Sequence, residues 1–166
     1  MSARVSTSIP HRAAIVETRV RGVRLYELPW VEDHKRGHLT VGNFGEEIPF
    51  VAMRYFITFG VPHEENRGEH AHRECAQFLL SAGGCCTVRV DDGTRRQSFV
   101  LDRPTLGILI PPMVWAAEFN HSPDSRLLVF ASHHYDPADY IRDYSKFLDE
   151  LQGVATRRGD SVSNHR

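Results

Sequence analysis

Residues 86–101 read CTVRVDDGTRRQSFVL and carry the clearest fold signal in the chain. Apolar and polar side chains alternate over 86–90, and a second short segment returns over 96–101. Between them, Asp91-Asp92-Gly93 supplies the residue types that favour a tight turn. The stretch therefore predicts two antiparallel strands joined as a hairpin.

The same signals recur on both sides of this hairpin. Short segments rich in β-branched and aromatic residues predict further strands at 23–28, 50–59, 76–80, 106–110 and 126–131. No segment before residue 136 has a convincing helical period. Many short strands at this spacing are typical of a β-sandwich or a small barrel, so we predict an all-β fold.

The C-terminal part carries the one helical pattern. Asp136 is a good cap, Pro137 suits the first helical position, and apolar residues follow at three- and four-residue spacing up to Leu151. We predict a short C-terminal α-helix that packs on the barrel or on a partner subunit. A single domain is expected over 19–152, with a poorly ordered lead-in at 1–18 and a flexible tail at 153–166.

Composition narrows the class of protein. The chain has 166 residues, which suits one domain, and its 20 basic residues nearly balance 21 acidic ones. This balance argues against a nucleic-acid partner. Three cysteines, two of them adjacent, do not form a disulfide framework. No apolar run reaches the roughly 18 residues of a membrane span, and no secretory signal is visible, so we expect a cytoplasmic protein without a membrane partner.

The stretch with chemistry is Arg67–His72, RGEHAH. On a strand, residues two apart point to the same face, so His70 and His72 share one face, which in a barrel can be the interior. Two imidazoles that face a cavity act either as metal ligands or as an acid–base pair.

With Gln77 and Gly84 downstream, this stretch resembles the first cupin motif, and residues 104–115 resemble the second. The resemblance implies a cupin (jelly-roll) β-barrel. Cupin metal sites use a glutamate of the first motif and a histidine of the second, but those positions hold Gln77 and Trp115 here. An amide is a weaker ligand than a carboxylate, and an indole is no ligand, so we expect no metal and no cofactor. His70 and His72 then remain as proton-transfer groups, for a tautomerisation through an enediol or for an epimerisation next to a ketone.

A closer resemblance is to the WxcM-like, FdtA-type sugar 3,4-ketoisomerases, and it covers about residues 22–149. It rests on R-G-E-H-A-H at 67–72, on L-L-V-F-A-S at 127–132 and on Y-D-x-x-D-Y-I-R at 135–142. Family members are dimeric cupins without a required metal. They convert dTDP-4-keto-6-deoxyglucose to a dTDP-3-keto-6-deoxyhexose, on the way to 3-amino sugars of surface polysaccharides or natural products.

The resemblance therefore implies an isomerase that forms a homodimer and binds a dTDP-linked keto-sugar. Guanidinium groups bind diphosphate oxygens bidentately, which suits the arginines of the family motif. One neutral histidine must take the C3 proton, and the residues leave open which one. The candidate site residues are His70 and His72 for catalysis and, for substrate binding, Arg36, Arg54, Arg67, Gln77 and Trp115.

Three other hypotheses stay open. The first is a nucleotide-sugar 3,5-epimerase, a class that uses a His–Asp dyad, although no aspartate is obviously placed beside His70. The second is a metal-dependent cupin enzyme, which metal analysis of the purified protein would reveal. The third is a non-catalytic nucleotide-sugar-binding module, which would have no activity to lose when both motif histidines are replaced.

Overall fold

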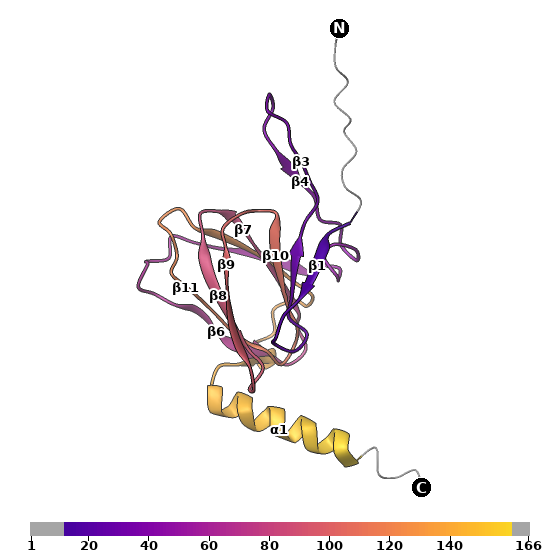
Figure 1. Cartoon of the computed structure of the whole chain (residues 1–166). Helices are drawn as coiled ribbons and strands as arrows, with labels where there is room; N and C mark the ends of the chain where they lie inside the picture. The colour runs from indigo at the N-terminus through magenta and orange to yellow at the C-terminus, as the bar shows by residue number, and fades with distance from the viewer. Residues whose placement is uncertain (1–11, 161–166) are drawn as a thin grey trace.

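The computed structural model describes residues 12–160, with side chains described up to residue 153 (Figure 1). In chain order, its elements are β1 (Ala14–Glu17), β2 (Arg24–Glu27), β3 (Trp30–Val31), β4 (Leu39–Thr40), β5 (Arg54–Phe59), β6 (Arg67–His72), β7 (Gln77–Gly83), β8 (Cys86–Asp91), β9 (Arg96–Leu101), β10 (Leu106–Ile110), β11 (Trp115–Phe119), β12 (Arg126–Ala131), the 3-10 helix η1 (Pro137–Asp139), β13 (Tyr140–Ile141) and the α-helix α1 (Tyr144–Asp160).

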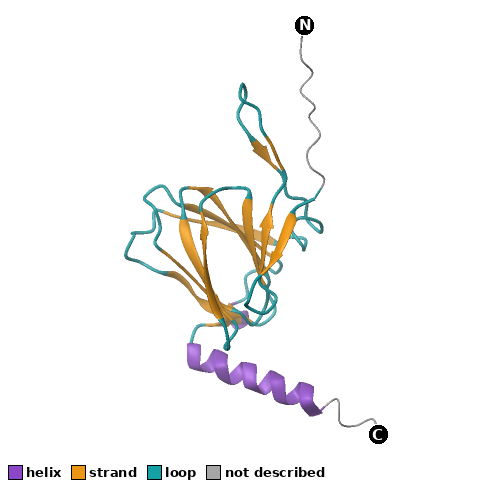
Figure 2. Cartoon of the chain, in the orientation of Figure 1, coloured by secondary structure: helices purple, strands orange, loops and turns teal. Residues whose placement is uncertain are grey.

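The strands form two antiparallel sheets that face each other, and β3 and β4 form a separate ribbon (Figure 2). The larger sheet has the order β1-β2-β10-β7-β12-β5, and the smaller one has the order β13-β6-β11-β8-β9. The predicted all-β fold with a C-terminal helix is confirmed. No pairing among the described strands joins the edge strand β5 to β13 or β6, so the barrel is open along that side.

The predicted hairpin at 86–101 is formed by β8 and β9, which pair antiparallel. Its turn is built by Asp92, whose backbone N–H donates to the Arg95 carbonyl at 3.1 Å. The Asp92 carboxylate accepts the backbone N–H groups of Thr94 and Arg95. Gly93 supplies the positive φ of 84° that this turn requires.

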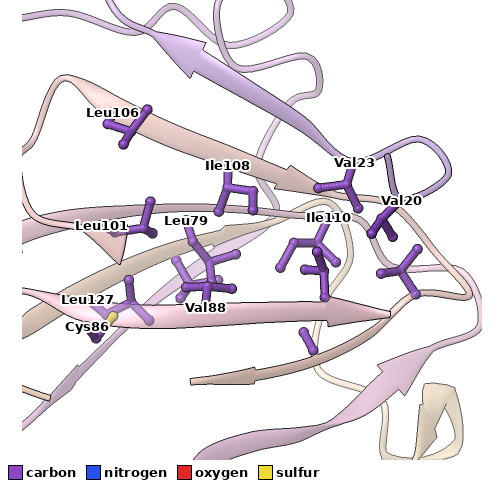
Figure 3. Close-up of a cluster of buried hydrophobic side chains, with 14 residues drawn as sticks. Val20, Val23, Leu79, Cys86, Val88, Leu101, Leu106, Ile108, Ile110 and Leu127 are labelled. Carbon is purple, nitrogen blue, oxygen red and sulfur yellow. The ribbon is translucent and has the colours of Figure 1, made fainter. Parts of the chain in front are cut away.

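The main core lies between the two sheets (Figure 3). Alternation along the strands places Leu79 of β7, Val88 of β8 and Ile108 of β10 inside, and all three are fully buried. Each such side chain contributes about 1.5–3 kcal/mol through its removal from water. On β6 and at the start of β7, the inward positions are instead polar, which places His70, His72 and Gln77 at the open side of the barrel.

The outer face of each sheet is covered differently. Tyr26, Phe78 and Ile48 form a second buried cluster on the outside of the larger sheet. Helix α1 lies across one end of the barrel, where Phe147 packs with Ala71 and Ile141 of the smaller sheet (Figure 1). The helix runs beneath the barrel in Figure 1, at the opposite end from the β3–β4 ribbon.

The C-terminal helix begins later than predicted. Pro137–Asp139 form the 3-10 helix η1, and Asp136 caps it by accepting the N–H of Ala138. Tyr140 and Ile141 do not continue the helix, because they pair with β6 as strand β13. The spacing of Tyr140 from later apolar residues imitates helical periodicity, but the strand pairing decides the conformation.

The expected ends of the domain also differ from the structure. Residues 1–11 and 161–166 lie outside the described residues. The described part of the predicted lead-in contains β1, which pairs with β2, and the described part of the predicted tail, 153–160, continues α1. In the part of the chain that the structure describes, no helix has the length and apolarity needed to cross a membrane.

Candidate active site

Strand β6 is irregular where the predicted motif begins. Gly68 and Glu69 have positive φ angles of 75° and 51°, and the register with β11 shifts between Ala116 and Ala117. An extra residue of β6 is thus accommodated as a β-bulge. The bulge leaves the Gly68 carbonyl 2.8 Å from Nδ1 of His70, so the strand itself orients this ring.

The ring of His72 is held from the other direction by Asp139. Nδ1 of His72 lies 2.6 Å from Oδ2 of Asp139. The other carboxylate oxygen accepts the backbone N–H of Glu74 at 2.7 Å. Since Asp139 ends η1, a segment 67 residues further along the chain fixes the orientation of a motif histidine.

The two imidazoles meet at their Nε2 atoms, which are 3.1 Å apart. The side-chain amide nitrogen of Gln77 lies 3.1 Å from Nε2 of His72. A carbonyl and a carboxylate only accept hydrogen bonds, so both Nδ1 atoms carry a proton. When both rings are neutral, both Nε2 atoms are unprotonated, and Gln77 satisfies the one on His72. The pair therefore lacks one proton between its rings and is arranged to take one up.

Burial keeps each imidazole neutral at neutral pH. It lowers the pKa of His72 to about 4, against the hydrogen bond to Asp139 that opposes this, and it also lowers the pKa of His70. Burial acts in the opposite direction on Asp139. The Glu74 N–H and the His72 ring outweigh it and hold the pKa of this carboxyl below its usual value. The site thus consists of two neutral bases with one carboxylate behind them.

An aromatic ring and two arginines complete the site. Tyr140 of β13 packs against both imidazoles, with centroid distances of 4.9 Å to His70 and 4.3 Å to His72. Arg54 of β5 donates from Nη2 to the Tyr140 hydroxyl at 3.3 Å. The guanidinium carbon of Arg142 lies 4.3 Å from the centroid of the Tyr140 ring. The site therefore bridges the two sheets at the open side of the barrel.

Among the predicted site residues, the structure brings together His70, His72, Gln77 and Arg54. The Nε atom of Arg54 is buried without a hydrogen-bond partner among the described residues, which is uncommon for a buried polar atom. Thr58 follows on the same face of β5, four residues on, and its hydroxyl is also buried without a described partner. Sequence analysis did not single out Thr58.

Arg67 lies at the beginning of β6, opposite Glu118 of β11. Its side chain is exposed, while Glu118 is buried inside the barrel. Burial raises the pKa of Glu118 to about 7, and the positive charge of Arg67 opposes this shift. Arg67 is thus a cation whose charge acts on a second carboxyl of the interior, and it directly precedes the Gly68–Glu69 bulge in the chain.

Two predicted residues are not placed with the histidines. Arg36 pairs with Asp33 at 2.6 Å, its side chain is 77% exposed, and it lies on the loop of the β3–β4 ribbon, far from β6 (Figure 1). Trp115 is on the outer face of the smaller sheet, where it packs against Tyr144 and Phe147 of α1. The alternation along β11 explains this, because its neighbour Ala116 pairs with His70 and faces inward.

The sequence analysis missed two functional candidates, Asp139 and Tyr140. Both fall inside the helix predicted to begin at Pro137, where neither would belong to a site on β6. The available signal was the Y-D-x-x-D-Y-I-R string at 135–142, which contains both of them. Their roles become visible only when β13 pairs with β6.

A metal would find one group of three ligand types in the described part of the chain. Ligand atoms of His72, Cys75 and Asp139 lie within 4.8 Å of one another. However, His72 and Asp139 are 2.6 Å apart, whereas two ligands on one tetrahedral zinc ion lie roughly 3.4 Å apart. The trio therefore fits a hydrogen-bonded acid–base pair better than a tetrahedral metal site.

Two facing antiparallel sheets, with a histidine pair on the inner face of one of them, define a cupin-type protein with a candidate acid–base site. The chain belongs to the WxcM-like, C-terminal family (FdtA), whose profile matches residues 21–152. The family expected from the sequence is confirmed.

Individual relatives agree with this assignment. A TDP-4-oxo-6-deoxy-alpha-D-glucose-3,4-oxoisomerase from Aneurinibacillus thermoaerophilus is 39% identical over 112 residues, which are 68% of this chain and 81% of that protein. A 3,4-ketoisomerase from Helicobacter canadensis has a TM-score of 0.76 at 33% identity, covering 79% of this chain and 98% of that one. A histidine-to-asparagine variant of the 3,4-ketoisomerase QdtA from Thermoanaerobacterium thermosaccharolyticum, in complex with TDP-4-keto-6-deoxyglucose, has a TM-score of 0.77 at 31% identity, covering 81% and 96%.

Proposed function

We propose that the protein is a nucleotide-sugar 3,4-ketoisomerase that converts dTDP-4-keto-6-deoxyglucose to a dTDP-3-keto-6-deoxyhexose. The observation that carries the proposal is the His70–His72 pair backed by Asp139, in which two neutral bases share room for one proton. The relatives support the substrate class, since their names specify TDP-linked 4-keto-6-deoxyglucose and 3,4-isomerisation.

In the first half of the reaction, the C3 proton of the sugar is removed. The adjacent 4-keto group makes this proton acidic, and a neutral imidazole accepts it. We assign the base to His70, because it is less buried than His72 and because, among the described residues, no side chain besides His72 contacts its Nε2. The proton supplies the N–H that the pair lacks, and Asp139 stabilises the positive charge through His72.

In the second half, the enediol that has formed is protonated at C4. The protonated histidine pair is the acid for this step, so it returns to its neutral state and the ketone appears at C3. Gln77 donates to Nε2 of His72 and keeps the orientation of that ring fixed between the two steps. No net proton, electron or oxidant is consumed.

Arginine side chains are the proposed contacts for the anionic part of the substrate. Arg54 supports this role through its buried, unpartnered Nε, and Arg67 through its exposed guanidinium at the start of β6. A contact from Arg36 requires a second subunit, because its ribbon lies away from β6 (Figure 1). Trp115 is not included, because it packs under α1.

We infer that the protein is a homodimer. Supporting this, the outer face of β5 exposes Tyr55, Ile57 and Phe59, which are 68%, 43% and 73% accessible. Clusters of exposed apolar residues on an edge strand are typical of interaction surfaces. Light scattering after gel filtration tests this, and an Ile57→Asp substitution is expected to shift a dimer toward monomer. A cytoplasmic location goes with this proposal, because the family's reaction belongs to sugar biosynthesis.

The 3,5-epimerase hypothesis gains one feature, since a His–Asp dyad is present as His72 and Asp139. The shared family and the relatives favour the ketoisomerase. The two reactions differ in where hydrogen exchanges, because the epimerase exchanges C3 and C5 hydrogens without moving the ketone.

The deciding experiment is NMR in D₂O of the EDTA-treated protein with dTDP-4-keto-6-deoxyglucose. A 3-keto product with solvent deuterium at C4 is expected, and its C4 configuration will identify the sugar. The His70→Asn/His72→Asn double variant should be inactive. Exchange at C3 and C5 without ketone migration would establish an epimerase, activity lost with a removable metal would establish a metal enzyme, and binding of dTDP without exchange would establish a binding module.

A further inference from the structure

The hydroxyl of Tyr140 has an environment that the two-histidine chemistry does not use. Within the described residues, its one hydrogen bond is accepted from Nη2 of Arg54 at 3.3 Å. A guanidinium cannot accept a hydrogen bond, so the phenolic proton remains available to a substrate oxygen. Tyr140 is also only partly buried, so its side chain is not sealed off from the open side of the barrel.

The ring of Tyr140 is held in a fixed relation to the histidines. In the register of β13 with β6, Tyr140 lies opposite His72, and its ring packs on both imidazoles. The carbonyl of Tyr140 accepts from Nη1 of Arg73 at 3.2 Å, and Arg142 covers the other part of the ring. The phenol is therefore held beside the histidine pair by both its backbone and its ring.

Two positive charges lie beside this phenol. Arg54 contacts the oxygen directly, and Arg142 lies over the ring. Negative charge that forms transiently on the phenolic oxygen is stabilised by both guanidinium groups. The remaining carboxylate of the site, Asp139, is bonded to His72 and to the backbone of Glu74.

The isomerisation moves a second proton that the histidine pair does not handle. One proton passes from C3 to C4, and the pair carries it. The other must leave the hydroxyl on C3 and arrive on the oxygen at C4. While the pair holds the carbon-bound proton, both of its Nε2 atoms are engaged, so the oxygen-bound proton needs another group.

We propose that Tyr140 is the catalytic residue that relays this oxygen-bound proton, an inference that rests on the proposed function. As His70 removes the C3 proton, the phenol donates its proton to the C4 oxygen, and the resulting phenolate is stabilised by Arg54. The phenolate then takes the proton of the C3 hydroxyl while the histidine pair protonates C4 and the C3 carbonyl forms. The phenol is restored. The C3–H bond and the O–H bonds of the phenol and of C3 are broken, and the C4–H bond and the O–H bonds of C4 and of the phenol are formed.

The test replaces only the hydroxyl. Tyr140→Phe keeps the ring that packs on the histidines, and we expect kcat to fall by about 100-fold or more, as for loss of a general acid–base group. The KM for the keto-sugar and the dissociation constant for dTDP should change by less than about 2-fold, because the proposed role is in proton transfer. Tyr135→Phe is the matched control: Tyr135 is 60% exposed, its ring lies 5.6 Å from that of Tyr140, and kcat should stay near the wild-type value.

A second variant separates proton transfer from packing. Replacement of Tyr140 by 3-fluorotyrosine, whose phenol is more acidic, keeps the shape of the side chain. If Tyr140 relays a proton, the alkaline limb of the pH profile of kcat should move to lower pH. A residue that only positions the histidines would leave that limb unchanged.

The outcomes distinguish this inference from the function on which it rests. A wild-type protein that does not convert dTDP-4-keto-6-deoxyglucose overturns the proposed function and the inference together. A wild-type protein that converts it, with Tyr140→Phe within about 3-fold in kcat, overturns only the inference. Loss of kcat together with a shifted pH profile in the fluorotyrosine variant supports the relay.

Discussion

Asp139 reaches His72 from a segment outside its strand, and the two side chains are 14% and 6% exposed. Their 2.6 Å contact fixes which nitrogen of His72 carries the proton, because the carboxylate accepts from Nδ1 and leaves Nε2 to face His70 and Gln77. The arrangement is the one that a carboxylate-backed catalytic imidazole requires.

Asp139→Asn is the first prediction. The amide retains an oxygen for the Glu74 N–H but cannot stabilise positive charge on His72, so kcat should fall by about 100- to 1,000-fold. Circular dichroism should show the wild-type fold. Asp143→Asn is the control, because Asp143 is exposed and accepts the backbone N–H of Lys146 outside the site. Near wild-type kcat in Asp139→Asn would remove the carboxylate from the mechanism.

Gly68 gives the second prediction. Its φ is 75°, and a Cβ added there would lie 3.0 Å from a carboxylate oxygen of Glu118 and 3.1 Å from the carbonyl of Ala116. Gly68→Ala should therefore cost about 1–3 kcal/mol of unfolding free energy in urea. Because the Gly68 carbonyl orients His70, kcat should fall as well.

Gly45→Ala is the control that separates backbone strain from crowding. Gly45 has a similar φ of 85°, but an added Cβ would have no heavy atom within 4 Å. This variant should lose about 1 kcal/mol of unfolding free energy, because alanine is disfavoured at this positive φ, and it should keep full activity. Equal losses of unfolding free energy in the two variants would show that crowding of the added methyl group against Glu118 does not contribute to the effect at Gly68.

The buried carboxyl of Glu118 gives the third prediction, which concerns pH. Its pKa is raised by burial from 4.5 to about 7 in the folded protein, so the folded state binds this proton more tightly than the unfolded state. The contribution of this proton to the unfolding free energy is fully present below pH 4.5 and is lost as the pH rises through about 7. The loss amounts to about 3 kcal/mol.

Glu118→Gln removes this titration. Relative to wild type, the variant should gain about 3 kcal/mol of unfolding free energy between pH 5 and pH 8, measured by urea unfolding at both values. His72, whose pKa is lowered, acts in the opposite direction between about pH 6.5 and 4, so the difference between the two proteins is the informative quantity. Glu69→Gln, which replaces an exposed carboxyl on the paired strand β6, is the control measured at the same two pH values.

Local patterning accounts for most of the strands but not for the whole site. The hairpin of β8 and β9 and the strands β10 and β12 follow from alternation, turn residues and short apolar runs. The motif histidines follow from the two-residue repeat of a strand. Asp139 does not, because its partner lies 67 residues earlier and no local pattern reports such a contact. Tyr140 was assigned to a helix, since only pairing with β6 distinguishes its spacing from a helical one.

Trp115 shows the same limit and gives the last prediction. Motif position suggested a substrate contact, but its ring lies 5.2 Å from that of Tyr144 and 5.7 Å from that of Phe147, on the opposite face of the sheet from His70. Trp115→Ala should cost about 3 kcal/mol of unfolding free energy, because it opens a cavity under α1. The KM for the keto-sugar should stay within about 2-fold of wild type, since no substrate contact is removed.

Trp115→Phe serves where the alanine variant does not fold, and it should cost about 1 kcal/mol. Urea unfolding and steady-state kinetics on the same preparations separate the two roles. A packing residue loses stability in proportion to the volume removed and leaves KM unchanged. A rise in KM of about 10-fold at unchanged stability would instead show that Trp115 contacts the substrate. It would then follow that α1 moves away from the smaller sheet during the reaction.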